Sequence, residues 1–180
     1  MPSSTDQMIA RAVPGSPASR EKPVVGLGPH LRPPLFVSDL KHRQKEAVLE
    51  ELVATLVAAG VTRAPEAVLA ALRQREALGS TGIGKGIAVP HARSTMVSER
   101  AVVVARSRRG VDFDSADGKP VHLCFLIVAP PLERDDIYLQ LLAHIVRGVR
   151  LARTRQRLLD AADFDAVRSI LIRASDDTPA

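Results

Sequence analysis

The chain has 180 residues, of which 46% are hydrophobic and 25% charged, a balance typical of one globular domain. Only 3% are aromatic, which argues against a binder of single-stranded nucleic acid, and the formal net charge of +5 is ordinary. No apolar run reaches the ~18 residues of a membrane span, and the single cysteine, Cys124, excludes both a disulfide framework and a cysteine-based metal site.

The first 34 residues form the most unusual segment by composition. They hold Pro2, Pro14, Pro17, Pro23, Pro29, Pro33 and Pro34, with Gly and Ser filling much of the rest. Such a segment buries too little apolar surface to offset its ordering entropy, so we expect a disordered extension over residues 1–34. It has no apolar centre like that of a secretory signal, and the cytoplasm is the expected location.

Two helices are predicted next. Apolar residues recur at helical spacing from Val48 to Val57, and Gly60 ends this pattern. A second helix is expected from Pro65, a favoured first-turn residue, to about Ala77. A glycine-rich loop and a short strand at 86–89 follow.

The second half of the chain predicts strands and then helices. Strands are expected at 101–106 and 121–128, separated by turn residues at 114–120; the second is apolar almost throughout, so we expect it to be central and covered on both faces. An amphipathic helix follows Pro130-Pro131 and carries Tyr138 to Val149. Two shorter helices are expected near 154–161 and 164–173, the last capped by Asp163. This order favours a sheet covered on both sides.

The segment GSTGIGKG (79–86) matches most of the nucleotide-binding pattern G-x-x-x-x-G-K, but Gly86 stands where Ser or Thr would bind magnesium. A helix precedes the glycines and a strand follows them, which reverses the order of a nucleotide loop. Nucleotide binding is therefore rejected. Two interpretations remain: the glycines expose successive N–H groups as an anion-binding nest, or they form a flexible connection.

His91 is the strongest candidate for chemistry. Pro90 is expected to fix the backbone and end strand pairing, leaving the imidazole at a strand terminus beside the glycines. A neutral imidazole, whose pKa is ordinarily near ~6.5, can act as a nucleophile. Arg75 precedes the loop and can pair with phosphate oxygens. A structural histidine and a solvated arginine are the alternatives.

The block REALGSTGIGKGIAVPH (75–91) resembles the signature of enzyme IIA domains of the bacterial phosphoenolpyruvate-dependent phosphotransferase system, fructose/mannitol type, which include the nitrogen-regulatory proteins. The likeness continues in VDFDSADGKPVHLCFLIVAPP (111–131) and, more loosely, over 36–174. It implies an enzyme IIA domain at 35–175 followed by a tail at 176–180. The implied fold is α/β (α+β), a three-layer α/β/α sandwich with a small mixed sheet covered by helices on both faces.

The resemblance also implies a function. His91 would accept a phosphoryl group from the histidine phosphocarrier protein and pass it to a permease domain, or keep it as a regulatory mark. Arg75 would neutralise the phosphoryl oxygens, and no metal, nucleotide or other cofactor would be needed. The phosphate loop would consist of Thr81, Gly82, Ile83 and Gly84.

One position departs from the family pattern. Members commonly carry a second histidine, in a His-Leu pair, where this chain has Tyr138-Leu139. Tyr138 either donates a hydrogen bond to the phosphoryl group or His91, or simply packs. A nitrogen-type regulatory phosphocarrier is the favoured function; the alternatives are a sugar-specific enzyme IIA and a binding module with impaired phosphotransfer.

Overall fold

The computed structural model describes residues 26–131 and 135–176, with the side chains of 135, 136 and 176 left out. Apart from a two-residue strand at 36–37, which the sequence does not predict, two helices come first, then the strands, then three helices. The helices are α1 (Lys45–Ala58), α2 (Pro65–Ala77), α3 (Asp135–Gly148), α4 (Ala152–Asp160) and α5 (Phe164–Asp176). None of these is long and apolar enough to cross a membrane, and no other helix in the described ranges is.

The strands make one mixed sheet. They are β1 (Phe36–Val37), β2 (Gly82–Gly84), β3 (Ile87–Ala88), β4 (His91–Arg93), β5 (Ala101–Val111) and β6 (Val121–Ala129). The long strands β5 and β6 are antiparallel, and β1 runs parallel to β5. Both β3 and β4 pair in parallel with β6, and β2 pairs with β3 in antiparallel orientation.

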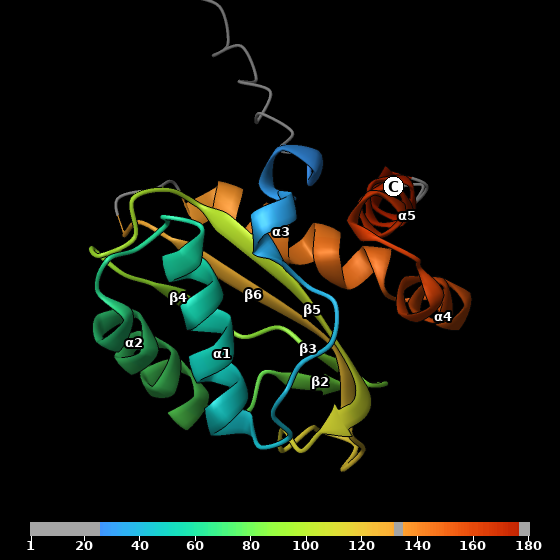
Figure 1. The fold of residues 1–180 in the computed structure, drawn as a ribbon, viewed down its shortest axis with the longest axis horizontal. Helices are drawn as coiled ribbons and strands as arrows, with labels where there is room; N and C mark the ends of the chain where they lie inside the picture. Colours follow the sequence, from blue (N-terminus) through green and yellow to red (C-terminus); the bar gives the residue numbers. More distant parts are fainter. Residues whose placement is uncertain (1–25, 132–134, 177–180) are drawn as a thin grey trace, which may run out of the picture.

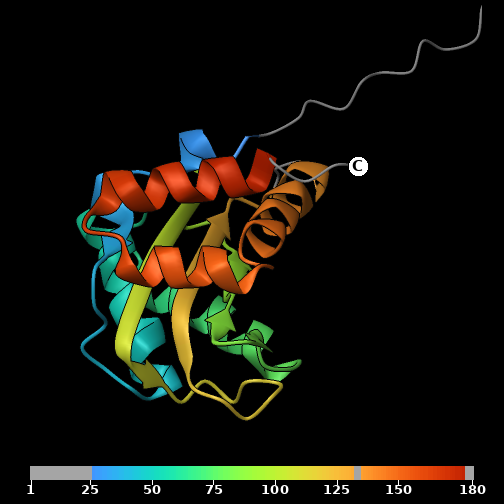
Figure 2. The same cartoon turned by 90° about the vertical axis from the view of Figure 1, so that its right-hand side faces the viewer.

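Side chains of β5 and β6 alternate between two apolar cores, because successive residues of a strand point to opposite faces. Val103 and Leu126 belong to the core under α1 and α2. Val102 and Phe125 belong to the core under α3, α4 and α5. Figures 1 and 2 show the two helical layers on opposite sides of the sheet, which confirms the predicted three-layer α/β/α sandwich. β6 lies between neighbours on both edges, as its continuous apolar sequence predicts.

The predicted extension is ordered in its last part. Residues 1–25 lie outside the described residues, but the chain from 26 to 35 contains two 3-10 turns, Gly28–His30 and Pro33–Leu35. Leu27 and Leu31 are 2% and 4% exposed and pack on the α3–α5 side of the sheet. These leucines supply the apolar contacts that the proline count obscured, so residues 26–34 are ordered, contrary to the prediction.

Three further elements differ from expectation. β5 continues to Val111, beyond the predicted end at 106. Residues 82–84, predicted as a loop, form β2. Pairing does not end at Pro90, because its carbonyl accepts a hydrogen bond from the Ile127 amide (2.9 Å) and β4 begins at His91. The Asp163 cap is confirmed by its carboxylate oxygen, which accepts the Ala166 amide at 2.9 Å.

Candidate functional site

The glycine-rich segment is a tight hairpin. β2 and β3 are joined by Lys85 and Gly86, both with positive φ (58° and 77°), the backbone that two-residue hairpins require at their central positions. Gly82 is needed for a different reason: a Cβ there would lie 2.8 Å from the Cα of Ser115. The segment is therefore a packed hairpin, and neither a flexible connection nor an open loop.

The backbone amides of this hairpin already have acceptors within the protein. Those of residues 81, 82, 84 and 85 donate to side chains at 3.2, 3.1, 3.2 and 2.8 Å. The acceptors are Glu76 for Thr81, Ser80 for Gly82, Ser115 for Gly84 and Asp117 for Lys85. An anion nest of free N–H groups is not formed by these four amides.

Glu76 joins the hairpin to the end of α2 by hydrogen bonds. Its carboxylate accepts hydrogen bonds from both the amide and the hydroxyl of Thr81 and lies 3.6 Å from the ammonium nitrogen of Lys45. Only 7% of the Glu76 side chain is exposed. Sequence reasoning quoted this residue within the motif but gave it no role. The hydrogen bonds depend on a turn that brings Thr81 back over α2, which residue spacing alone does not reveal.

The tautomer of His91 follows from the partners of its two ring nitrogens. Nδ1 lies 2.7 Å from the carbonyl oxygen of Val89, and a carbonyl only accepts, so Nδ1 carries the proton. Nε2 lies 3.0 Å from Nε of Arg75, and a guanidinium only donates, so Nε2 carries the lone pair. The nucleophilic atom of the ring is therefore Nε2.

The surroundings also keep this imidazole neutral. Burial lowers the pKa of His91 below its ordinary 6.5, and the positive charge of Arg75 lowers it further. The hydrogen bond to Val89 and the charge of Glu76 act in the opposite direction but are outweighed. At neutral pH the Nε2 lone pair is thus not blocked by a proton.

Arg75 is held in the last turn of α2. Besides its hydrogen bond to His91, it donates from Nη1 to the carbonyl oxygen of Gly79 at 2.9 Å. The residue that the sequence placed before the loop therefore contacts the imidazole of His91 directly. Its guanidinium fork is suited to phosphoryl oxygens.

Tyr138 lies against His91 from the first turns of α3. The two ring centroids are 6.1 Å apart at an interplanar angle of 61°, and Tyr138 is 7% exposed. Burial raises the pKa of Tyr138 to about 12, so its hydroxyl stays protonated and can donate. The guanidinium carbon of Arg93 lies 4.8 Å from the centre of the Tyr138 ring.

Arg93 is a site residue that the sequence reasoning missed. It follows His91 by two residues in β4, and residues two apart on a strand share a face. The pattern H-A-R would have revealed it once a strand was assigned there. Arg75, His91, Tyr138 and Arg93 thus form one cluster, with the hairpin residues beside it through the bond from the Val89 amide to the Thr81 carbonyl (2.9 Å).

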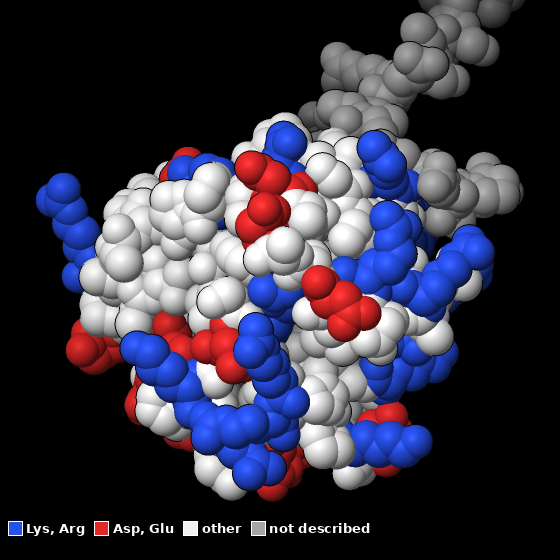
Figure 3. Space-filling view, turned by 45° about the vertical axis from the view of Figure 1, so that its right-hand side comes forward, with Lys and Arg blue, Asp and Glu red and all other residues white. Residues whose placement is uncertain are grey.

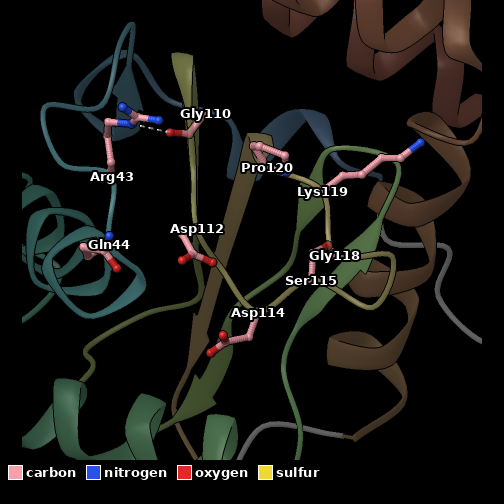
Figure 4. A pocket seen from close by; sticks show the side chains of 9 residues that line it. All are labelled: Arg43, Gln44, Gly110, Asp112, Asp114, Ser115, Gly118, Lys119 and Pro120. Carbon is pink, nitrogen blue, oxygen red and sulfur yellow. Dashed lines mark hydrogen bonds between the residues drawn. The ribbon is translucent and has the colours of Figure 1, made fainter.

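Other polar features lie apart from this cluster. His122 is held through Nδ1 to the carbonyl oxygen of Ser107 at 2.8 Å. A hollow of about 610 Å³ beside the β5–β6 connection is drawn in Figure 4, where Arg43 turns to the carbonyl of Gly110. Its Asp114 pairs with Lys45 at 2.6 Å. Among the described residues no group of three or more His, Cys, Asp or Glu is placed to hold a metal ion.

Comparisons with known proteins agree on one family. Residues 30–174 match the family model of the phosphoenolpyruvate-dependent sugar phosphotransferase system, EIIA 2. A fructose-specific EIIA component of Haloferax volcanii is 39% identical over 71% of this chain and 82% of its own length. A nitrogen regulatory protein of Bradyrhizobium diazoefficiens is 38% identical over 77% of this chain and 90% of its own.

A solved structure and a longer relative complete the comparison. The nitrogen regulatory protein IIA-Ntr of Neisseria meningitidis superposes with a TM-score of 0.75 at 31% identity, covering 81% of this chain and 98% of that one. The fructose-specific EIIABC component of Bacillus subtilis is 36% identical over 74% of this chain, but the match spans only 21% of that relative's length.

Proposed function

Because the chain belongs to the EIIA 2 family of the phosphoenolpyruvate-dependent sugar phosphotransferase system, we propose that it is a phosphocarrier that accepts a phosphoryl group on Nε2 of His91. The observation that carries this proposal is the pair of hydrogen bonds at His91. Nδ1–H donates to the carbonyl oxygen of Val89, and the unprotonated lone pair is on Nε2, which accepts from Arg75.

The proposed step is an in-line displacement at phosphorus. The donor is a phosphorylated histidine of the histidine phosphocarrier protein. The lone pair of His91 Nε2 forms a new N–P bond while the donor's N–P bond breaks, and its electron pair stays on the donor nitrogen. No proton has to move at His91, because the lowered pKa leaves Nε2 unprotonated and the Nδ1–H keeps its hydrogen bond to the carbonyl oxygen of Val89. Since one N–P bond replaces another, the step is reversible.

Arg75 and Arg93 would supply the positive charge. Phosphoryl transfer needs positioning and charge stabilisation more than other covalent chemistry. Once Nε2 bonds to phosphorus it can no longer accept from Arg75, so the Nε–H of Arg75 would turn to a phosphoryl oxygen. Arg93, held on the ring of Tyr138, would bring a second guanidinium to the same face.

The hairpin would form one side of the phosphoryl site. The predicted phosphate loop, Thr81 to Gly84, uses the amides of residues 81, 82 and 84 for internal hydrogen bonds, so we propose that it walls the pocket. Ile83 is 45% exposed there and offers apolar surface to a docking partner. The protonated hydroxyl of Tyr138 is the proposed replacement for the second histidine of other members, as a neutral donor.

Downstream, we propose phosphorylation-dependent regulation in the cytoplasm, with a target protein that distinguishes free from phosphorylated His91. Because the ring keeps its Nδ1–H, phosphorylation would change the charge at His91 by about −1 and add three acceptor oxygens beside the two arginines, a difference that a partner can recognise. The 38% identity to a nitrogen regulatory protein supports this role. The 39% identity to a fructose-specific EIIA component supports the second candidate, delivery to a fructose- or mannitol-type permease domain.

The test is to incubate the chain with phosphoenolpyruvate, enzyme I and the histidine phosphocarrier protein, and to measure its mass. We expect an acid-labile gain of one phosphate, assigned to Nε2 by ³¹P NMR. His91→Ala should abolish the gain. His122→Ala, which removes a ring held in the same way through Nδ1, should retain it. No gain in the folded wild type would refute the proposal and leave a binding module. Transfer onward to a fructose-type EIIB domain would favour the second candidate over regulation.

A further inference from the structure

A basic hollow lies where α3, α4 and α5 meet, away from the residues around His91. Its volume is about 460 Å³, within the range of small-molecule sites, roughly 300–1,000 Å³. Five arginines line it: Arg147, Arg150, Arg153, Arg157 and Arg173. Figure 3 shows Lys and Arg side chains gathered on the right-hand side of the molecule, where α4 and α5 come forward.

These five guanidinium groups have no anionic partner in the described part of the chain. All five residues are exposed, and none of their guanidinium groups makes an ion pair or a hydrogen bond with a described residue. The lining contains no carboxylate. Asp160, at the far end of α4, accepts instead from Gln156 at 3.0 Å. Like charges are thus brought together without internal neutralisation, which is unfavourable unless an anion joins them.

Helix dipoles explain only part of this arrangement. Arg147, Arg157 and Arg173 lie in the last turns of α3, α4 and α5, where positive charge is favourable. Arg153 lies in the first turn of α4, where positive charge is unfavourable. That turn has no acidic residue and no side-chain cap. Arg153 and Thr154 of this turn line the hollow, so the positive end of α4 lies at its wall beside the cations, and both favour an anion there.

The junction that shapes the hollow is fixed by another arginine. Arg155 donates from Nη1 to the carbonyl oxygens of Val149 and Arg150, at 2.9 and 2.7 Å. It thereby joins the end of α3 to α4 and sets the position of the hollow's wall. Arg155 is committed to structure, whereas the five lining arginines are left for a ligand.

We propose that this hollow binds a small oligophosphate, an anion with two or more linked phosphate groups. One phosphate has too few oxygens to engage five guanidinium groups on three helices, whereas a chain of phosphates can accept from several forks at once. The lining has no aromatic residue on which a base would stack, so recognition is of phosphate. The proposal does not depend on phosphotransfer at His91.

The test is calorimetric titration of the full chain with tripolyphosphate and, separately, with inorganic phosphate. We expect saturable binding with a Kd for tripolyphosphate at least tenfold below that for phosphate, and weakening with salt. Arg153→Gln/Arg157→Gln should raise the tripolyphosphate Kd at least tenfold. The matched control, Arg63→Gln/Lys119→Gln, removes the same charge outside the hollow and should leave the Kd within about twofold.

Three results would overturn the proposal. The first is the absence of saturable binding, or equal weakening by the two double variants, which would reduce the effect to net charge. The second is loss of binding in Arg75→Gln, which would place the anion at the phosphotransfer site. The third is tighter binding of a 20-base-pair DNA duplex than of tripolyphosphate, together with loss of DNA binding in Arg153→Gln/Arg157→Gln. That result would make the ligand nucleic acid. Thermal unfolding of each variant confirms that the comparison is between folded proteins.

Discussion

The guanidinium of Arg75 donates its Nε–H to Nε2 of His91 across 3.0 Å, and so occupies the lone pair proposed to attack phosphorus. The arginine lowers the affinity of that nitrogen for a proton. In the proposed transfer this hydrogen bond has to open, and the same guanidinium would then bind the phosphoryl oxygens and stabilise the product.

Replacing Arg75 by Gln should raise the pKa of His91, because a positive charge that lowers it is removed while the ring stays buried. The initial phosphorylation rate should fall about 100-fold, the usual cost of losing a donor to developing charge. NMR titration of the imidazole and the mass-gain assay measure the two effects. Arg73→Gln is the control, since Arg73 bonds to Glu46 and Glu50 instead. An unchanged or lower pKa in Arg75→Gln would contradict the assignment.

The pH dependence of transfer should show His91 losing its lone pair on protonation. The rate is expected to be flat above pH ~6.5 and to fall only at more acid pH, through the lowered pKa. The free energy of unfolding should also decrease at acid pH. Below pH ~6.5 His91 binds a proton in the unfolded chain but not yet in the folded chain, so the folded state loses stability as the pH falls. Thermal unfolding of the wild type and His91→Gln tests this, and equal slopes in the two proteins would contradict it.

Glu76→Gln should shift the same pKa the other way. The carboxylate raises the pKa of His91, so its removal should lower that pKa further, opposite to the effect of Arg75→Gln. The hairpin should also lose about 1–2 kcal/mol, because Thr81 exchanges a charged acceptor for a neutral one. NMR titration and urea unfolding measure the two effects. A higher pKa in Glu76→Gln would show that the carboxylate acts on His91 in some other way.

Tyr138→Phe keeps the ring against His91 and Arg93 but removes the hydroxyl. If the hydroxyl donates to the phosphoryl group, the lifetime of the phosphohistidine should fall about tenfold, the effect of one hydrogen bond. Tyr138→His, which restores the residue common in the family, should keep or lengthen the lifetime. Decay of the labelled protein at neutral pH measures it. Equal lifetimes for wild type and Tyr138→Phe would show that Tyr138 only packs.

Arg106→Met should destabilise the fold by about 3 kcal/mol. Arg106 is 7% exposed, and its Nη1 donates to the carbonyl oxygens of Leu158, Leu159 and Ala161, at 3.1, 3.2 and 2.7 Å, and so caps the end of α4. Methionine fills the space but leaves these acceptors without a donor. Arg108→Met, two residues along the same strand and exposed, is the control. Urea unfolding that gave the same loss for both variants would contradict the cap.

The parts of the fold that sequence predicted are those set by local pattern. Helical spacing located α1 and α2, and the apolar run of β6 predicted its central place. Leu27 and Leu31 were missed because their burial depends on helices more than a hundred residues later in the chain. Prolines there predict irregular backbone, which is compatible with close packing.

In the candidate site, too, the sequence predicted some features and not others. His91 and Arg75 were identifiable from one short block, and the structure places them in contact. The amide partners of the hairpin were not identifiable, because Ser115 and Asp117 come from a turn some thirty residues on. The tautomer of His91 depends on a hydrogen bond between a side chain and a backbone carbonyl, which no residue spacing encodes.

The pairing of β3 and β4 with β6 restricts how this segment can change in evolution. Ala88 pairs with Cys124 and His91 with Ile127, so the register is the same before and after the break at Val89 and Pro90. Inserting or deleting one residue in that break would turn the imidazole to the other face of the sheet. Substitutions there can be tolerated, but a change in length would take the imidazole away from Arg75 and Tyr138 while leaving every residue of the motif present.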